Sequence, residues 1–328
     1  MPRVSGAIAA TTLSCLFLSA TANALGPIDG KVYGRLNVTY QYEDNADSDG
    51  VWKLENNSSR LGFKGETAID SGLNILYQLE FGVEVDDGEK DGDTFSQRDI
   101  FLGLEGSWGQ LKAGRLTIPF KQAKGDFDRF NDLQGELGKI IDGENRLSNT
   151  LQYASPELLT GLVAKLAVIP GEGEGDEDDA ADAASASLVY KREQLYLALA
   201  VNNNIKQQDQ LRLVTTWHWG ALGEGLFSVG ALYQHSKGHD DDFRYIDGKD
   251  EADAYGGSAV YALRKNSVKV QYIVSDRSAR MSDSSQFSVA LDHQLGERSV
   301  LYTYYADRKA DEREYETRYL AVGLKHSF

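Results

Sequence analysis

The chain has 328 residues, a formal net charge of −16 and a single cysteine, Cys15. An acid excess of this size argues against a nucleic-acid partner, because binding phosphates requires clustered Lys and Arg. The composition combines 17 Tyr, 4 Trp and 33 Gly with only 5 Pro, which indicates an all-β chain.

The first 24 residues predict a cleaved signal peptide. They carry one charge, Arg3, followed by a small and apolar run over residues 7–18 and an A-x-A cleavage site that ends at Ala24. The apolar run is too short for a membrane anchor. We therefore expect a mature chain of residues 25–328 that forms one domain, holds no cysteine, and carries 33 basic and 50 acidic residues, a net charge of −17.

Short segments in which apolar and polar residues alternate follow one another along the mature chain. Residues 31–40 place Val32 and Leu36 on one face and Lys31 and Arg35 on the other. No mature segment approaches the roughly 18 apolar residues of a transmembrane helix. Repetition of a period of two instead indicates strands that face lipid on one side and water on the other. The same period recurs in residues 73–83, 195–201, 211–219, 268–274, 287–291 and 300–306.

Three segments alternate less clearly, namely residues 97–105, 183–190 and 255–263. In the first of these, Ile100 and Leu102 share a face on which strict parity would also place Arg98. An arginine exposed to lipid at the bilayer midplane costs about 2–4 kcal/mol. We therefore expect a bulge in this strand or an exterior covered by protein.

The connections are of two kinds that alternate along the chain. Short connections such as residues 70–72, 192–194 and 264–266 are followed by long, acidic ones such as residues 170–182 and 237–251. This asymmetry is typical of outer-membrane barrels, which have tight periplasmic turns and longer outer loops. The sequence thus predicts an all-β fold, a transmembrane antiparallel up-and-down β-barrel of about sixteen strands. The last strand, ending at Phe328, should close it.

One connection is different from the others. The alternation lapses over residues 116–147, and a loop of about thirty residues usually has a function. We predict that this third outer loop folds into the barrel and narrows the hole.

Charges on the predicted strands and on this loop suggest how such a hole could discriminate ions. Parity places Arg35, Arg60 and Lys64 inside, as a basic wall. Opposed charges across a narrow gap create a transverse field, although each single acid could equally belong to a solvated face. The loop contributes the candidate acids Asp126, Asp128, Asp132 and Glu136, alongside Lys121, Lys124 and Arg129.

Short motifs spread over most of the chain carry a family resemblance. They are Tyr33-Gly34-Arg35, residues 59–65, 72–74, 78–80, 98–103, 109–115, 146–149 and 153–156, and the terminal residues 322–328. In their order, with the long loop between Arg115 and Arg146, they resemble the Gram-negative general porins, in particular the neisserial and burkholderial branch of trimeric sixteen-stranded barrels.

This resemblance implies a homotrimer in the Gram-negative outer membrane, in contact with lipid and lipopolysaccharide. It also implies an inward third loop and passive diffusion of ions and small hydrophilic solutes, without catalysis, cofactor or metal. It adds Arg98 and Arg115 to the basic wall. The sequence departs from the family in lacking a Gly-rich tip in the long loop and in having more acidic outer loops.

Other interpretations remain open. A substrate-selective porin for a sugar, an organic acid or phosphate would share these features. An outer-membrane barrel enzyme could use histidines such as His235 and His239, but the sequence has no nucleophile elbow. The residues from Asn45 approximate a calcium loop whose twelfth position, Asn56, is not the required Glu. The acidic residues 171–182 could attract divalent cations or form a solvated loop.

Overall fold

The computed structural model describes residues 30–46, 49–69, 72–89, 92–171, 181–238, 250–278 and 281–328. The expected signal peptide, residues 1–24, lies outside the described residues, so its removal stays a prediction. His239 and most of the acidic run in residues 171–182 lie outside them too. Over the described ranges, no helix is long and apolar enough to cross a membrane.

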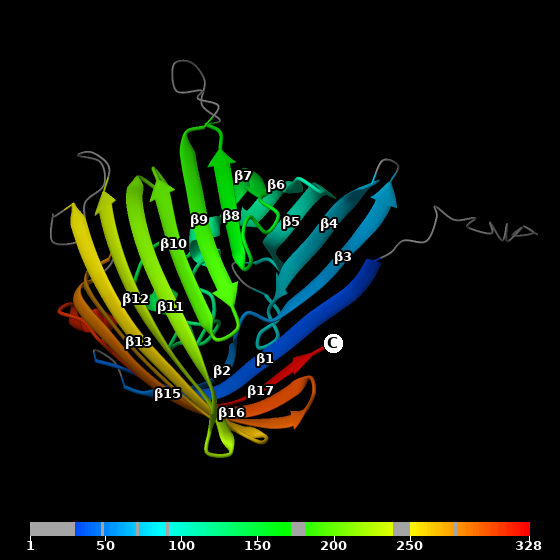
Figure 1. The fold of residues 1–328 in the computed structure, drawn as a ribbon. Helices are drawn as coiled ribbons and strands as arrows, with labels where there is room; N and C mark the ends of the chain where they lie inside the picture. The colour runs from blue at the N-terminus through cyan, green and yellow to red at the C-terminus, as the bar shows by residue number, and fades with distance from the viewer. Residues whose placement is uncertain are drawn as a thin grey trace, which may run out of the picture.

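The described residues form antiparallel strands joined edge to edge, with three short helical turns (Figure 1). The helical turns are α1 (Pro119–Gln122), η2 (Leu137–Lys139) and η3 (Arg313–Tyr315). The strands are β1 (Gly30–Asn45), β2 (Val51–Asn56), β3 (Arg60–Ile69), β4 (Leu73–Val83), β5 (Phe95–Gly106), β6 (Gly109–Thr117), β7 (Arg146–Ala154), β8 (Leu162–Ile169), β9 (Ala183–Arg192), β10 (Leu195–Asn203), β11 (Gln208–Leu222), β12 (Gly225–Gly238), β13 (Glu251–Leu263), β14 (Asn266–Arg277), β15 (Ser282–Gly296), β16 (Ser299–Lys309) and β17 (Thr317–Ser327).

The sheet closes on itself because the first strand pairs with the last. β1 pairs with β17 from Arg35↔Ser327 to Asn45↔Thr317, and the backbones of Gly34 and Phe328 exchange two hydrogen bonds of 3.0 Å. On its other edge, β1 pairs with β2 over residues 38–43 and with β3 over residues 30–35. β2 and β3 are therefore two halves of one barrel strand, so the seventeen segments make the expected sixteen-stranded barrel.

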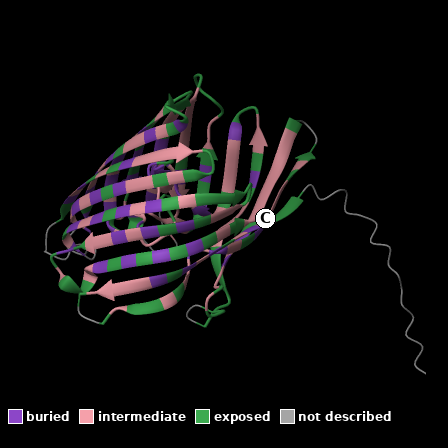
Figure 2. Cartoon of the chain, turned by 90° about the horizontal axis from the view of Figure 1, so that it is seen from below, coloured by how far each residue is buried: buried purple, intermediate pink, exposed green. Residues whose placement is uncertain are grey.

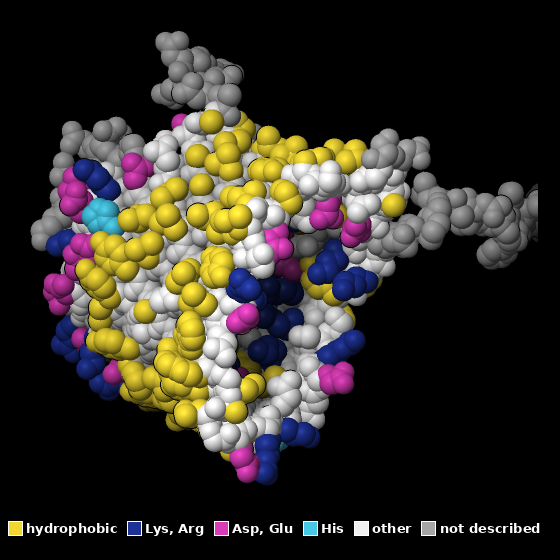
Figure 3. Space-filling model, viewed as in Figure 1, with side chains coloured by type: hydrophobic (Ala, Val, Ile, Leu, Met, Phe, Trp, Pro, Cys, Tyr) yellow, Lys and Arg dark blue, Asp and Glu magenta, His cyan; other side chains and the backbone are white. Residues whose placement is uncertain are grey.

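The two faces of each strand have different environments. In β10, Leu197, Leu199 and Val201 are exposed on the outer surface, whereas Ala198 and Ala200 are buried inside. Figure 2 shows this alternation along many strands, and Figure 3 shows hydrophobic side chains over the outer face beside a hollow that contains Lys and Arg. The period of two in the sequence thus corresponds to an apolar exterior and a more polar interior.

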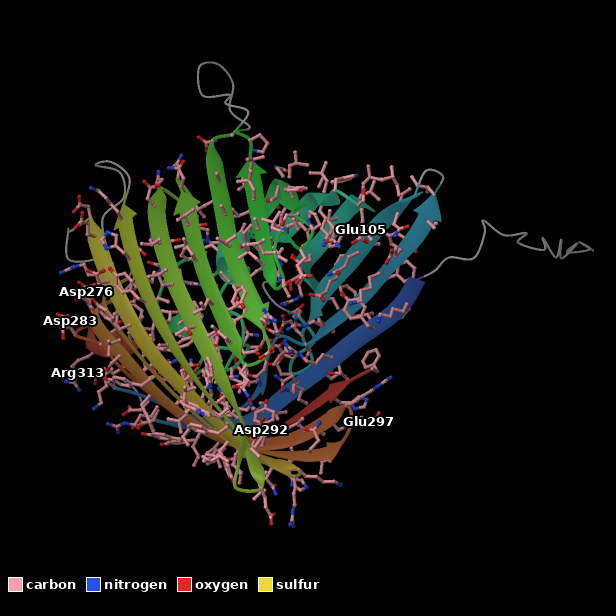
Figure 4. All side chains as sticks on the ribbon, in the orientation of Figure 1. Glu105, Asp276, Asp283, Asp292, Glu297 and Arg313 are labelled. Carbon is pink, nitrogen blue, oxygen red and sulfur yellow. The ribbon has the colours of Figure 1, made fainter. Side chains whose placement is uncertain are left out.

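Charged side chains also mark the two ends of the barrel. Asp276, Asp283 and Arg313 lie at the end that carries the long connections, and Glu297 lies at the end with the short turns (Figure 4).

A bulge accounts for the irregular alternation of residues 97–105. Leu79 pairs with Ile100 and Phe81 pairs with Gln97, so Glu80 faces two residues, Arg98 and Asp99. A bulge lets both side chains face inward while Ile100 stays on the outer face. Arg98 Nε accordingly lies 2.6 Å from Glu80 Oε1. The two other weakly alternating segments form parts of β9 and β13.

Candidate functional site in the barrel lumen

The segment between β6 and β7, residues 118–145, lies inside the barrel, and we call it the lumen loop. It follows the inner wall from β9 to β16. The Phe120 N–H donates to Ser185 Oγ of β9 at 3.1 Å, and the Arg129 N–H donates to Gln271 Oε1 of β14 at 2.8 Å. Arg308 of β16 donates to the Gln134 carbonyl at 3.2 Å. The loop thus narrows the lumen from one side, as its lapse in alternation predicted.

Apolar packing holds the lumen loop against this wall. Phe120, Phe127 and Phe130 are fully buried, and the wall offers small residues opposite them. A Cβ added at Gly256 would lie 2.6 Å from Phe127 Cζ, and one at Gly230 would lie 3.1 Å from Phe127 Cδ2. The two glycines therefore make the room that the Phe127 ring occupies, and this close packing fixes the loop's position.

A buried ionic cluster, Lys124, Glu144 and Arg212, forms a second attachment that we call the loop latch. Arg212 of β11 is fully buried; its Nη1 lies 2.7 Å from Glu144 Oε1, and its guanidinium lies 4.3 Å from the centre of the Phe120 ring. Lys124 Nζ lies 2.8 Å from Glu144 Oε2. Burial alone would raise the pKa of Glu144, but the charges of Lys124 and Arg212 outweigh it and lower that pKa to about 2.

Replacing Arg212 by leucine should destabilise the barrel, because it leaves the buried carboxylate of Glu144 without one of its cations. Removing one partner of a buried ion pair costs about 3–5 kcal/mol. We expect the free energy of unfolding, measured by urea titration of the refolded protein in detergent, to fall by that amount. Arg264→Leu is the matched control, because that side chain is 79% exposed and paired with exposed Glu224. Equal midpoints for the two variants would contradict the latch.

Where the lumen loop reaches β1 and β3, three arginines gather on adjacent parts of the wall, and we call Arg35, Arg60 and Arg98 the arginine cluster. Arg35 and Arg60 are direct cross-strand neighbours in β1 and β3. Like charges in that arrangement are destabilising. Asp132, at the tip of the lumen loop, compensates by lying 2.5 Å from Arg35 Nη2 and 3.0 Å from Arg60 Nη2. Glu80 forms an ion pair with Arg98, so the three arginines share two carboxylates.

The structure separates the four predicted loop acids into two pairs. Asp132 pairs with Arg35 and Arg60 of the barrel wall. Burial alone would raise the pKa of Asp132, but these two arginines outweigh burial and lower it. Asp126 is 63% exposed, and its Oδ2 lies 3.9 Å from His218 Nε2. Asp128 and Glu136 instead face into the loop.

The inner pair has structural contacts. Asp128 accepts hydrogen bonds from Lys124 Nζ at 2.8 Å and from the Leu137 N–H at 3.2 Å. Glu136 accepts from the Asp132 N–H at 3.0 Å, and burial, with the nearby charge of Asp128, raises the pKa of Glu136. These two acids therefore stabilise the loop's shape rather than face the open lumen.

The remaining residues of the predicted basic wall lie away from the arginine cluster. Lys64 is four residues beyond Arg60 toward the short-turn end, and its Nζ lies 4.7 Å from the centre of the Tyr33 ring. Arg115 pairs with Ile100, which places it on the outer face. Its guanidinium donates to Ser148 Oγ at 2.9 Å. The structure therefore does not bring Arg115 into the cluster.

Several charged residues of the lumen were not singled out from the sequence. Glu80 lies between the arginines, and parity alone could have identified it. Asp99, which pairs with Arg146 Nε at 2.8 Å, depends on the bulge and has no such signal. Lys112 of β6 also faces inward, with its Nζ 4.9 Å from the centre of the Phe101 ring. Within the ranges that the structure covers, no three His, Cys, Asp or Glu side chains gather as a metal site would require.

Comparison with known proteins gives consistent matches. The sequence model of a family described as Gram-negative porin matches residues 7–313. The outer membrane porin protein 32 of Delftia acidovorans is 24% identical over 311 residues, which cover 87% of this chain and 85% of that protein. The major outer membrane protein P.IA of Neisseria meningitidis serogroup A is 31% identical over 188 residues, which cover 50% of this chain. The chain spans less than half the length of this neisserial relative, 46%.

Solved structures share the fold. The anion-selective porin from Comamonas acidovorans superposes with a TM-score of 0.69 at 19% identity, covering 91% of this chain and 99% of that one. The OmpF porin of Salmonella typhi gives a TM-score of 0.68 at 15% identity, covering 91% and 97%. At these identities the likeness establishes the sixteen-stranded barrel.

Proposed function

The chain belongs to the Gram-negative porin family, and on that premise we propose that it forms a water-filled outer-membrane channel for passive diffusion of ions and small hydrophilic solutes. The observation that carries the proposal is the lumen loop. It lies inside a closed barrel with an apolar exterior, and it is attached to one wall by buried phenylalanines and the loop latch. A loop fixed beside an arginine cluster sets a size limit and a charge preference without any catalytic step.

The charge preference at the narrowest part is for anions. Support comes from the arginine cluster, whose three cations share Glu80 and Asp132, and from the inward lysines Lys64 and Lys112. A low-dielectric wall focuses the field of such charges into the lumen. The acidic outer loops act in the opposite direction, but salt screens charges in water beyond about 10 Å at 0.1 M ionic strength.

We also propose that the channel is a homotrimer, in contact with lipid and lipopolysaccharide. Support comes from Arg115, Gln97 and Ser148, which make a polar site on the outer face of β5, β6 and β7. An arginine facing lipid costs about 2–4 kcal/mol near the midplane, and a neighbouring subunit that covers it would remove that cost. We therefore propose that Arg115 lies at the contact between subunits and not, as predicted from the sequence, in the lumen.

Reconstitution into a planar bilayer under a tenfold KCl gradient tests the function. We expect discrete conductance steps and a zero-current potential of the sign that anion preference produces. A protein that inserts without conductance would contradict the channel. A potential of the opposite sign would leave the channel standing and contradict the anion preference.

A further inference from the structure

An uncharged side chain, Tyr33 of β1, lies beside the arginine cluster on the inner wall. Tyr33 pairs with Gly62 of β3, and Gly62 pairs with Glu80 of β4, so these three residues form one row across the wall. A Cβ added at Gly62 would lie 2.5 Å from Tyr33 Cζ. The ring of Tyr33 therefore lies across β3 in the room that the glycine leaves, and its hydroxyl donates to Glu80 Oε2 at 2.8 Å.

The two oxygens of the Glu80 carboxylate have different partners. Oε1 lies 2.6 Å from Arg98 Nε, whereas Oε2 accepts the hydrogen bond from the Tyr33 hydroxyl. Glu80 is only 7% exposed, so little water is at hand to replace a lost donor. Leaving a buried carboxylate oxygen without a donor is costly. The hydroxyl of Tyr33 therefore fixes the direction in which this carboxylate points.

The orientation of Glu80 decides how the arginine cluster is compensated. Arg60 Nη2 lies 3.0 Å from Asp132 Oδ2, a carboxylate that Arg35 also binds. Among the described residues, Arg60 is the one further cation within 4 Å of the Glu80 carboxylate, at 3.9 Å. A charge-assisted hydrogen bond is about twice as strong as a neutral one. Released from Tyr33, Glu80 would therefore turn toward Arg60 and compensate more of the positive charge of the cluster.

Resting on the proposed channel function, we propose that Tyr33 is a positioning residue for ion selection. Tyr33 carries no charge and acts through Glu80, by keeping one carboxylate oxygen turned away from Arg60. The ion preference of the lumen then depends on the hydrogen bonding of the wall as well as on the number of charges that the wall carries.

Tyr33→Phe tests the proposal, because it removes the hydroxyl and keeps the ring over Gly62. The full-length protein is reconstituted in a planar bilayer under a tenfold KCl gradient. We expect open channels whose permeability ratio shifts toward cations by about twofold, since one hydrogen bond is lost rather than one charge. An unchanged zero-current potential, or a shift toward anions, would overturn the proposal and leave the channel function intact. Absence of conductance in the unmodified protein would contradict the channel function itself.

A double-mutant cycle separates positioning from a general effect on the wall. In a Glu80→Gln background, Tyr33→Phe should leave the zero-current potential unchanged, because the amide has no charge that could be redirected. An equal shift in both backgrounds would mean that Tyr33 acts independently of Glu80, and the positioning role would be wrong.

Two further variants make the test specific. Gly62→Ala keeps the Tyr33 hydroxyl but displaces the ring, because the added Cβ would lie 2.5 Å from Tyr33 Cζ; it should reproduce the shift of Tyr33→Phe. Tyr302→Phe is the matched control, since that buried hydroxyl donates to the uncharged Asn37 Oδ1 at 2.6 Å, and its potential should not change. An unchanged potential in Gly62→Ala, or a shift in the control as large as that of Tyr33→Phe, would overturn the proposal.

Discussion

Replacing Arg35 and Arg60 together by glutamine should shift the permeability ratio of the channel toward cations by about tenfold. The change removes two cations and also releases Asp132, whose carboxylate is bound by both arginines. One unit charge acts on an ion 4 Å away with about 1 kcal/mol even in bulk water, and 1.4 kcal/mol corresponds to a factor of ten. The zero-current potential in a KCl gradient measures the shift, and adding Lys64→Gln should extend it.

Two further variants make this result specific. Asp132→Asn leaves the arginines without their shared carboxylate and should shift the preference toward anions. Arg264→Gln changes an exposed cation in a short turn and should leave the potential unchanged. If the Arg35 and Arg60 variant kept the original potential, those arginines could not lie at the narrowest part of the lumen.

The fold was predictable because lipid and water impose a simple rule on every strand. The alternation of apolar and polar residues identified most strands, and the difference between short and long connections identified the class of barrel. The interrupted strand that contains β2 and β3 shows the limit. Ser58 between them has a positive φ of 55°, and such a local break changes neither composition nor periodicity enough to be read.

The site was predictable only where alternation is regular. Arg35, Arg60 and Lys64 were placed by parity, and the structure brings them to the inner wall. Arg98 and Asp99 share a face only because of the bulge opposite Glu80, which follows from pairing between strands rather than from either strand alone.

The alternation of apolar and polar residues could not predict which side chains of the lumen loop face the barrel wall. Its inner face is determined by long-range contacts, such as Phe127 against Gly230 and Gly256, that no local spacing reveals. For the same reason, sequence alone could not tell that Asp128 and Glu136 face into the loop while Asp132 pairs with Arg35 and Arg60.

Shortening the lumen loop should raise the single-channel conductance about twofold or more, because the narrowest section controls flow through a water-filled pore. Deleting residues 126–136 and joining the ends with two glycines removes Phe127, Phe130 and Asp132. It keeps Lys124 and Glu144, so Arg212 retains its carboxylate partner. The heat-modifiable mobility of the barrel on a denaturing gel serves as the control for folding.

This deletion also separates size from charge. It removes Asp132 and so raises the net positive charge at the arginine cluster. The wider lumen, however, lets each ion pass farther from that charge, which weakens its effect on the ion. The Arg35 and Arg60 substitutions should do the reverse, changing the ion preference with little change in conductance. If the folded deletion variant had the original conductance, the loop could not form the constriction, and both the size limit and the transverse field would need another source.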